Sequence, residues 1–573
     1  MLKLLLVVCF CVGSFGLSWN PTGRRSPAAQ QVEFRLQLLK NNPQWLDETL
    51  EAVSDPKSKE YEIYRTNEDI RSNIGRSDSE IRQITLWFRK QCFELCPLRG
   101  KAMIHGDFIQ ISTCTARFEC IFDTQLVQYK HPLYDSFIYH SKDTSYDLQK
   151  RLKELNAPAV VRDLVLNVNN VGRLPPALKK FSSGFPYQGV KVTPVVVAEN
   201  YGTKGFQNDR SSDGGQLGNA FAEFGKQYFF PSDIAAIQSH YNLPNNSIAH
   251  IVGNNDPNAF GSQYLECTLD ATYLSSVADQ PTWGIFETSF QYDFVAFTQT
   301  LMNTANCPKI ISISYGAPES DFGEDNMNTV DDEFKKLGIL KFTLFFSSGD
   351  TGVGNTLDSV FACGKYETNY PAASPYVVAV GGTYLRKTGN SEEGVWRYGG
   401  SGFSNHNRRP SWQDSAVTKY LSTAQNLPDS SKYNNTGRAL PDVSAYATNC
   451  RIIVQGKIQY IGGTSASAPI TASVFTYVNV QRLKNGKGPM GYITPQLYTS
   501  GGELGPDFGE DNMNTVDDEF KKLGILKFTL FFSSGDTGVG NTLDSVFACG
   551  KYETNYPAAS PYVVAIVIRE ERV

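Results

Sequence analysis

The chain has 573 residues, of which 41% are hydrophobic and 19% charged, the composition of a folded protein large enough for more than one domain. Its formal net charge of -5 offers no basic surface of the kind that attracts nucleic acid or an anionic membrane. We therefore expect neither among its partners.

The first 16 residues are predicted to be a secretory signal peptide. Lys3 precedes the apolar run Leu4–Val12, which is too short to span a bilayer and is followed by the small-residue stretch 13–16. No later run is long and apolar enough for a transmembrane helix. Glycosylation sequons begin at Asn245 and Asn434 and agree with a secretory route.

Residues 17–189 are predicted to form a separate α+β domain. Val32–Leu39 and Trp45–Val53 have the apolar spacing of helices, whereas Phe108–Ser112 resembles a strand. The domain ends in a stretch rich in proline, serine and glycine, residues 174–186, which is typical of a linker.

Four of the 11 cysteines cluster in this domain, at Cys92, Cys96, Cys114 and Cys120. A secretory route favours disulfides. Zinc is the alternative for Cys92 and Cys96, but no second CxxC or His-rich group follows at ligand spacing. We predict a local disulfide and leave the pairing open.

Residues 190–500 alternate short apolar strands with helical segments and glycine-rich turns. This alternation predicts an α/β domain with a mainly parallel sheet flanked by helices. Functional residues of such sheets lie beyond the carboxyl ends of the strands. The predicted strands, too short for buried helices and rich in β-branched or aromatic residues, include Ile310–Ser314, Phe342–Phe346, Val377–Val380 and Ile452–Val454.

Residues 501–573 are predicted to be an aberrant tail. Asp321–Ala379 recurs letter for letter as Asp507–Ala565, at a constant offset of 186 positions. Structural repeats drift apart and follow the period of one supersecondary unit, which this repeat does not. It indicates a very recent duplication or a misassembled gene.

Ser465 is the predicted nucleophile. It lies between the strand-like Ile458–Ile461 and the apolar helical stretch Ile470–Val480, and therefore at a strand-to-helix turn. The glycines before it permit a tight turn, and the helix N-terminus offers N–H groups where negative charge would develop. An ordinary serine or threonine helix cap is the alternative.

A serine nucleophile needs a base, usually a histidine held by an aspartate. None of the six histidines lies in a glycine-rich catalytic motif, although His240 and His250 remain candidates. Glu266 and Asp270 share one face of a predicted helix, and two close carboxyls resist joint ionisation, so one can hold a proton while the other accepts one. A solvated acidic face is the alternative.

Asp350 is a third candidate acid, in Ser348-Gly349-Asp350 directly after a predicted strand. A carboxyl group that stays protonated can donate a hydrogen bond to an oxyanion. The alternative is an aspartate that merely forms a turn among glycines.

Taken together, Glu266-x3-Asp270, Ser348-Gly349-Asp350 and the stretch 463–469 resemble the sedolisin (serine-carboxyl peptidase) family. Order, spacing and flanking residues agree over roughly residues 30–500. Further motifs of the resemblance are Glu51–Pro56, Ala222-Glu223-Phe224, Ile313–Gly316, Val380–Thr383, Gly402–Asn405 and Pro441-Asp442-Val443.

The resemblance implies a subtilisin-like catalytic fold behind an activation prodomain that serves as intramolecular inhibitor and chaperone. It implies that Ser465 is the nucleophile, Glu266 its general base, Asp270 the residue that orients Glu266, and Asp350 the oxyanion donor. The implied substrates are peptides or unfolded proteins, cleaved at acidic pH either by release of tripeptides from free N-termini or by endopeptidase action. Maturation is expected near residues 184–190, and the location is expected to be the lysosome or the extracellular space.

The family also implies a structural calcium ion, bound by a segment rich in aspartate and glycine that should begin after Tyr498. The duplicated block begins there instead, and its acids in 507–517 do not resemble a calcium loop. We therefore assign no metal or cofactor ligands. One alternative is a catalytically inactive relative destabilised by the loss of this segment; another is a Ser-His-Asp hydrolase, whose activity would rise toward neutral pH.

Overall fold

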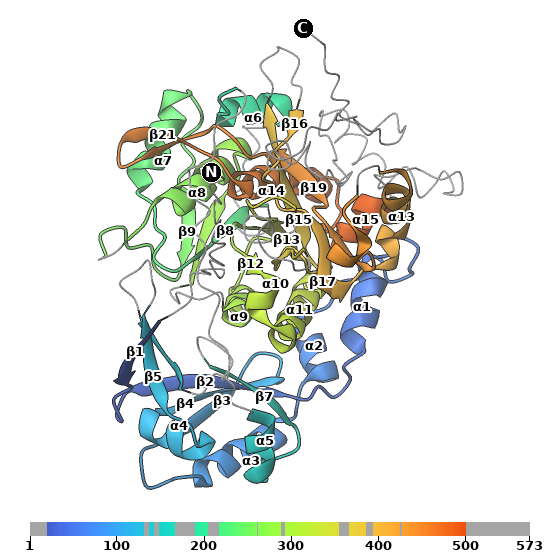
Figure 1. The fold of residues 1–573 in the computed structure, drawn as a ribbon. Helices are drawn as coiled ribbons and strands as arrows, with labels where there is room; N and C mark the ends of the chain where they lie inside the picture. Colours follow the sequence, from blue (N-terminus) through green and yellow to red (C-terminus); the bar gives the residue numbers. More distant parts are fainter. Residues whose placement is uncertain are drawn as a thin grey trace, which may run out of the picture.

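The computed structural model describes two parts of the chain, one up to residue 166 and a larger one from residue 190 (Figure 1). The predicted signal peptide, the linker, the tail and most of the maturation segment lie outside the described residues. No helix among the described residues is both long and apolar enough to cross a membrane. The described residues are 20–130, 137–142, 148–166, 190–203, 217–259, 262–287, 293–353, 366–385, 393–424 and 427–499.

An eight-stranded sheet forms the centre of the larger part. Its strand pairs are parallel except for the antiparallel pair at one edge, which confirms the predicted mainly parallel sheet. In spatial order the strands are β16 (Glu393–Val395), β15 (Val378–Leu385), β13 (Thr343–Ser347), β11 (Ile310–Ile313), β8 (Asn219–Phe224), β10 (Thr282–Glu287) and β9 (Ile248–Val252), with β19 (Val443–Tyr446) beside β15.

Helices cover both faces of this sheet. Phe345 packs into one apolar cluster, whereas its neighbours Leu344 and Phe346 pack into another on the opposite face. Strands buried on both faces are continuous apolar runs, which is why the sequence reveals them. The first face is covered by α8 (Leu265–Val277) and α14 (Thr464–Lys484), and the second by α9 (Phe294–Asn303) and α11 (Glu324–Ile339).

One predicted strand of the sheet belongs elsewhere. Ile452–Val454 lies in β20 (Cys450–Val454), which pairs with β21 (Lys457–Ile461) in an antiparallel hairpin outside the main sheet. The other described elements of the larger part are α6 (Pro194–Asn200), α7 (Pro231–His240), β12 (Ala317–Pro318), α10 (Glu319–Phe322), β14 (Asn369–Tyr370), β17 (Gly402–Arg408), η1 (Ser411–Gln413), α13 (Asp414–Thr423), η2 (Ser430–Lys432), β18 (Gly437–Leu440) and α15 (Thr494–Thr499).

The helix predicted at Val32–Leu39 is wrong, because this stretch lies in strand β2 (Gln31–Leu38). Phe34, Leu36 and Leu38 are all buried, and their two-residue period is that of a strand. The α+β prediction for the N-terminal part is confirmed. Its other elements are β1 (Asn20–Arg25), α3 (Asp78–Lys90), β3 (Arg99–Ala102), β4 (Phe108–Cys114), α4 (Thr115–Phe122), β5 (Leu126–Lys130), β6 (Phe137–Ser141), α5 (Leu148–Glu154) and β7 (Val161–Leu166).

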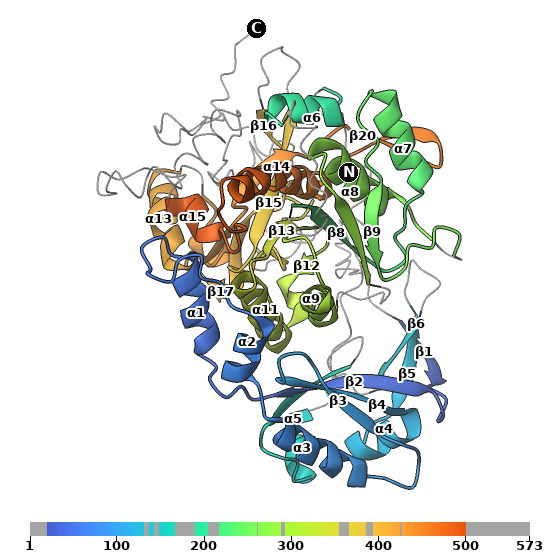
Figure 2. The ribbon, with the colours of Figure 1, turned by 180° about the vertical axis from the view of Figure 1, so that it is seen from behind.

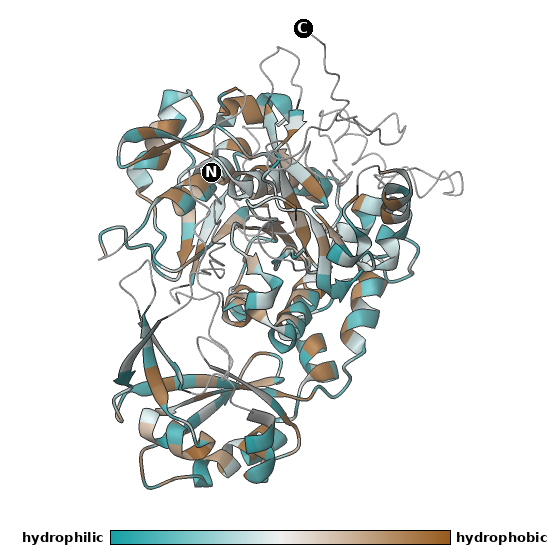
Figure 3. Ribbon diagram, viewed as in Figure 1, coloured by the Kyte–Doolittle hydropathy of each residue, from teal (hydrophilic) through white to brown (hydrophobic). Residues whose placement is uncertain are grey.

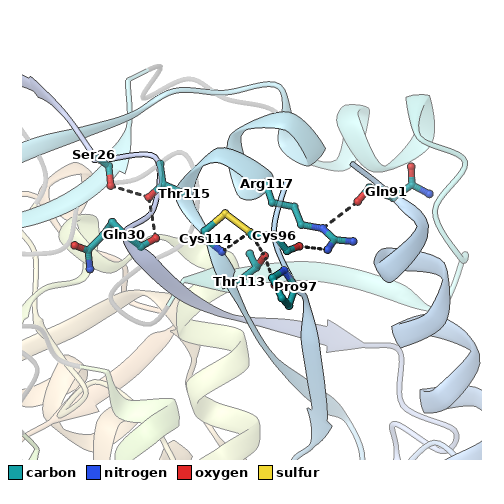
Figure 4. Close-up of a disulfide and its surroundings, with 9 residues drawn as sticks. All are labelled: Ser26, Gln30, Gln91, Cys96, Pro97, Thr113, Cys114, Thr115 and Arg117. Atoms are coloured by element: carbon teal, nitrogen blue, oxygen red, sulfur yellow. Dashed lines mark hydrogen bonds between the residues drawn. A yellow bond between two sulfur atoms is a disulfide. The ribbon is translucent and has the colours of Figure 1, made fainter. Parts of the chain in front are cut away.

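Two disulfides close the segment between α3 and β3 onto the rest of the N-terminal part. Cys92 pairs with Cys120 of α4, and Cys96 pairs with Cys114 at the end of β4. Figure 4 shows the second bond, beside which the Arg117 guanidinium donates to the main-chain oxygens of this segment. The predicted local disulfide is thus confirmed, and zinc ligation by these cysteines is not.

Helices α1 (Trp45–Ser54) and α2 (Asn67–Ile74) extend from the N-terminal part along the larger part, as Figure 2 shows from behind. The helix predicted at Trp45–Val53 is therefore confirmed. Figure 3 shows hydrophobic residues on both helices. Leu46, Leu50, Ile70 and Ile74 lie in the same buried cluster as the apolar side of α11. The N-terminal domain therefore shares part of its apolar core with the larger part.

An ion pair adds to this interface. Arg35 of β2 donates from Nη1 to Asp293 Oδ1 at 2.8 Å and from Nη2 to Asp293 Oδ2 at 2.5 Å, with both side chains nearly buried. Asp293 is also the N-cap of α9, because its Oδ1 accepts from the Ala296 amide at 2.9 Å. One carboxylate thus joins the start of a helix in the larger part to a strand of the N-terminal part.

Candidate active site

Ser465 lies at the start of α14, after the hairpin β20–β21, which confirms the predicted strand-to-helix turn. The turn requires a glycine at 463, where φ is 138° and a Cβ atom would come within 2.5 Å of Asp350 Oδ2. The Ser465 side chain is buried, and its Oγ has no hydrogen-bond partner among the described residues. The hydroxyl is therefore not committed to capping the helix.

Asp350 follows β13 and contacts the same turn. Its Oδ1 accepts hydrogen bonds from Thr464 N at 2.7 Å and Thr464 Oγ1 at 2.9 Å. Burial raises the pKa of Asp350 to about 7, although the hydrogen bonds from Thr464 act to lower it. At acidic pH the carboxyl holds a proton, and its Oδ2, which has no partner among the described residues, is available to donate it.

Glu266 and Asp270 lie one turn apart on α8, in the predicted helix. Asp270 is fully buried, which raises its pKa well above the ordinary value, and the charges of Glu223 and Glu266 raise it further. Ser314 Oγ, directly after β11, lies 3.0 Å from Asp270 Oδ1 and 3.2 Å from the main-chain oxygen of Ser465. Ser314 therefore connects the carboxyl helix to the serine turn.

Glu223, near the end of β8, is a further buried carboxyl to which the sequence prediction gave no role. It accepts a hydrogen bond from the Tyr315 hydroxyl at 2.5 Å. Burial raises its pKa well above the ordinary value, and the Glu266 charge acts in the same direction. The available signal was an acid near the carboxyl end of an otherwise apolar strand, the position where functional residues of parallel sheets collect.

These residues converge because β8, β11 and β13 are neighbours in the sheet. Their carboxyl ends carry Glu223, Ser314 and Asp350, respectively. Helices α8 and α14 pack against one another on one face, where Ser473 Oγ donates to the Tyr273 oxygen at 3.1 Å. The site therefore combines a hydroxyl, three buried carboxyls with raised pKa values, and Glu266 one turn from Asp270.

The candidate histidines have other neighbours. The His240 ring lies against Tyr241, and the His250 ring lies 4.4 Å from the Trp283 ring. Among the described residues, the recorded hydrogen-bond partners of Asp270 and Asp350 include no histidine. His105 and His140 lie in the N-terminal part, His406 lies beside Asn328, and His131 is outside the described residues.

Within the described ranges, no group of three or more His, Cys, Asp and Glu side chains could hold a metal ion. The calcium segment that the resemblance places after Tyr498 would fall in residues beyond 499, outside those ranges. Both the family's calcium ion and its loss from this chain remain predictions, and no metal ligand is assigned.

The sequence is similar to known peptidases and their activation domains. The model "Pro-kumamolisin, activation domain" matches residues 18–168, and the model "Subtilase family" matches residues 247–488. The chain is 30% identical over 514 residues to tripeptidyl-peptidase 1 of Rattus norvegicus, with 84% of this chain and 85% of that protein covered. This chain belongs to the sedolisin (serine-carboxyl peptidase) family.

Two further relatives support the assignment of this sedolisin to the family. Tripeptidyl-peptidase 1 of Dictyostelium discoideum is 29% identical over 548 residues, covering 88% of this chain and 87% of its own. The Homo sapiens protein is 28% identical over 500 residues, covering 84% and 85%. A solved Pseudomonas sedolisin matches 55% of this chain and 86% of its own at 24% identity and a TM-score of 0.41, and the assignment stands without it.

The fold prediction is confirmed: the larger part is a subtilisin-like α/β domain with a mainly parallel sheet, preceded by an activation prodomain. The chain is thus a serine-type peptidase with a prodomain. The boundaries at 17–189 and 190–500 remain predictions, as do the roles of the individual site residues.

Proposed function

We propose that this sedolisin is an acid-acting serine-carboxyl peptidase, synthesised as a zymogen. The observation that carries the proposal is that the Ser465 turn is held on two sides by buried carboxyls, by Asp350 through Thr464 and by Asp270 through Ser314. No imidazole is needed, because acids that retain protons can take the roles that histidine and amide donors take elsewhere.

In this mechanism Glu266 removes the proton from Ser465 Oγ as the oxygen attacks the peptide carbonyl. Asp270, protonated because it is buried, orients Glu266. Asp350 donates its proton in a hydrogen bond to the developing oxyanion. Glu266 then protonates the leaving amine, and water hydrolyses the acyl-enzyme by the same route.

The proposed substrates are peptides or unfolded proteins. Relatives named tripeptidyl-peptidase 1 support release of tripeptides from free N-termini, and endopeptidase action is the second candidate mode. Two peptides of one sequence, with a free and an acetylated N-terminus, distinguish them: tripeptide release requires the free amine, whereas internal cleavage proceeds on both. The prodomain is proposed to inhibit and chaperone its own catalytic domain until cleavage near residues 184–190.

We propose an acidic compartment of the secretory route, either the lysosome or an acidified extracellular space, as the place of action. The observation that supports it is Asp350, because burial raises its pKa to about 7 and it therefore holds its proton only below neutral pH.

Acid incubation of the purified chain tests the proposal. We expect self-processing near residue 190 that is abolished in Ser465→Ala and in Glu266→Gln but unchanged in His240→Ala and His250→Ala. Processing that survives Glu266→Gln and is lost with either histidine would instead support a Ser-His-Asp hydrolase. A chain that stays intact in every form would support the inactive relative.

A further inference from the structure

His105 lies in the loop between β3 and β4 of the prodomain and is fully buried against the catalytic domain. Its Nε2 is 2.9 Å from Asn67 Oδ1 at the start of α2. The Asn67 amide in turn donates to the Met302 oxygen of α9 at 3.0 Å. The other ring nitrogen, Nδ1, is buried without a hydrogen-bond partner among the described residues. Burial of one nitrogen without a hydrogen-bond partner costs free energy in the docked state, and burial of a protonated, charged ring there would cost more.

The charges around this ring come from both domains. On α11, the fully buried Lys336 binds Asp107 Oδ2 of the same prodomain loop at 2.6 Å and also pairs with Glu333. Burial acts to raise the pKa of Asp107, but the charges of Lys336 and Lys40, with the hydrogen bond from Lys336, together outweigh it and lower the pKa. Glu333 stays beside Lys336 on α11 whether or not the prodomain is docked.

Two further cations belong to the prodomain. Arg71 of α2 lies near the ring and lowers the pKa of His105, and Lys40 acts on the neighbouring Asp107. Among the described residues, the cations Lys336 and Arg71 disfavour a positive charge on the ring, and the acid Asp107 favours it. In the docked state these neighbours disfavour protonation of the His105 ring.

We propose that His105 is an acid sensor of the zymogen: it docks as the neutral imidazole, and its protonation favours release of the prodomain loop from α11. This inference rests on the proposed function, because it names the event that lets acid open the same site.

The direction follows from linkage. Burial first, and then the charge of Lys336, lower the pKa of docked His105 to about 3, whereas an exposed histidine titrates near 6.5. The undocked state therefore binds more protons. Docking has its full strength above about pH 6.5 and weakens by about tenfold per pH unit as the pH falls toward 3. Asp107 does not titrate in the upper part of this window, because its lowered pKa keeps it charged.

Opening of the interface can be measured without catalysis in full-length Ser465→Ala protein. Hydrogen exchange of the amides in residues 103–107 and in α2, followed from pH 6.5 to 4.5 and corrected for intrinsic rates, reports the opening equilibrium. We expect His105→Gln to reduce the pH slope by up to one proton, so that the parent gains about 50-fold more opening across this range than the variant. Equal slopes in parent and variant would overturn the proposal.

His140→Gln in the same background is the matched control. This prodomain histidine is also buried, but its Nδ1 is 3.1 Å from the Ser141 oxygen and its ring lies against Tyr129, both within the prodomain. These two contacts do not depend on docking, so the parental slope should persist. Loss of the slope in His140→Gln as large as in His105→Gln would count against a specific sensor at 105.

A second measurement needs no change at position 105. Exchange of the imidazole C2 hydrogen, read by mass spectrometry in the Ser465→Ala chain, gives the pKa of His105 in the closed state. We expect a value below about 5, and a value at or above about 6.5 would overturn the proposal. Neither measurement depends on peptide hydrolysis. A chain that never self-processes would therefore contradict the proposed function but would leave the proposal for His105 unaffected.

Discussion

Asp350 combines two properties that a surface aspartate lacks: it is buried, and only one of its oxygens is held by Thr464. Because burial raises its pKa to about 7, it is a hydrogen-bond donor throughout the acidic range. Asp350→Ala should reduce kcat about 10²- to 10³-fold at pH 4.5, the cost of one oxyanion donor. Steady-state hydrolysis of an unstructured peptide measures this.

Asp350→Asn is the companion variant, because its amide donates at every pH. The ratio of its activity to that of the parent should increase as the pH rises through about 7, where the parental carboxyl loses its proton. A ratio that stays constant from pH 5 to 8 would show that residue 350 donates no titrating proton.

Glu223 is expected to tune the acid pair without contacting substrate. Its charge helps to raise the pKa of Asp270, so Glu223→Gln should lower that pKa and move the alkaline limb of the kcat profile toward acid by about one pH unit. KM should stay nearly unchanged. Full kcat and KM profiles check this, and a uniform loss of activity at all pH values would indicate a structural role instead.

At the scale of the element, the turn before α14 depends on a single glycine. In Gly463→Ala the new Cβ would meet Asp350 Oδ2 at 2.5 Å in a left-handed conformation, so the oxyanion donor must move. We expect kcat to fall by about 10²-fold, as for a small misplacement of a catalytic group.

Gly486, just beyond the other end of α14, provides the matched control. It also has a positive φ, of 75°, but a Cβ there would meet nothing within 4 Å. Gly486→Ala should cost about 1 kcal/mol of stability and leave kcat unchanged. Similar kcat losses in the two variants would mean that the loss at 463 comes from backbone strain alone.

The elements that the sequence predicted well are those with strong local signals. The strands at 310–314 and 342–346 are continuous apolar runs because both faces of the sheet are buried, and α8 and α14 follow helical periods. The stretch that forms β2 does alternate, with Phe34, Leu36 and Leu38 separated by polar residues, so the helix prediction misread a local strand signal. The burial of Arg35 could not be predicted, because its charge is neutralised by Asp293. That partner is 258 positions away, and no local pattern reports it.

For the site, motif order predicted Ser465, Asp350 and the α8 pair, and the structure links Asp350 and Asp270 to the Ser465 turn through Thr464 and Ser314. The position of Ser314 between Asp270 and the Ser465 oxygen was not predictable, because it depends on which strands are neighbours. The prodomain interface is hidden for the same reason: Lys336 and Asp107 are 229 positions apart.

For the whole molecule, buried acids set the pH dependence of stability. Burial raises the pKa of Glu319, Asp350 and Glu393 to about 7 and that of Asp331 to about 6. Each of these acids has a higher pKa folded than unfolded, so its stabilising effect is complete below about pH 4 and is lost as the pH rises toward 7. We expect the free energy of unfolding to fall from pH 4.5 to 7.5.

Urea unfolding of full-length Ser465→Ala protein carrying His105→Gln measures this, because the second change removes the opposite pH dependence of prodomain docking. Stability that increases over this range would contradict the assignment of these carboxyls as buried and protonated in acid.

Asp293 has a consequence for how the zymogen assembles. The Asp293 carboxylate caps the N-terminus of α9 and also forms the ion pair with Arg35 of the prodomain. It is held in the position that Arg35 requires only once α9 has formed. A catalytic domain in which α9 has not formed therefore lacks this binding site for the prodomain. Stable docking of the prodomain, and with it inhibition, thus requires that this part of the catalytic domain has folded.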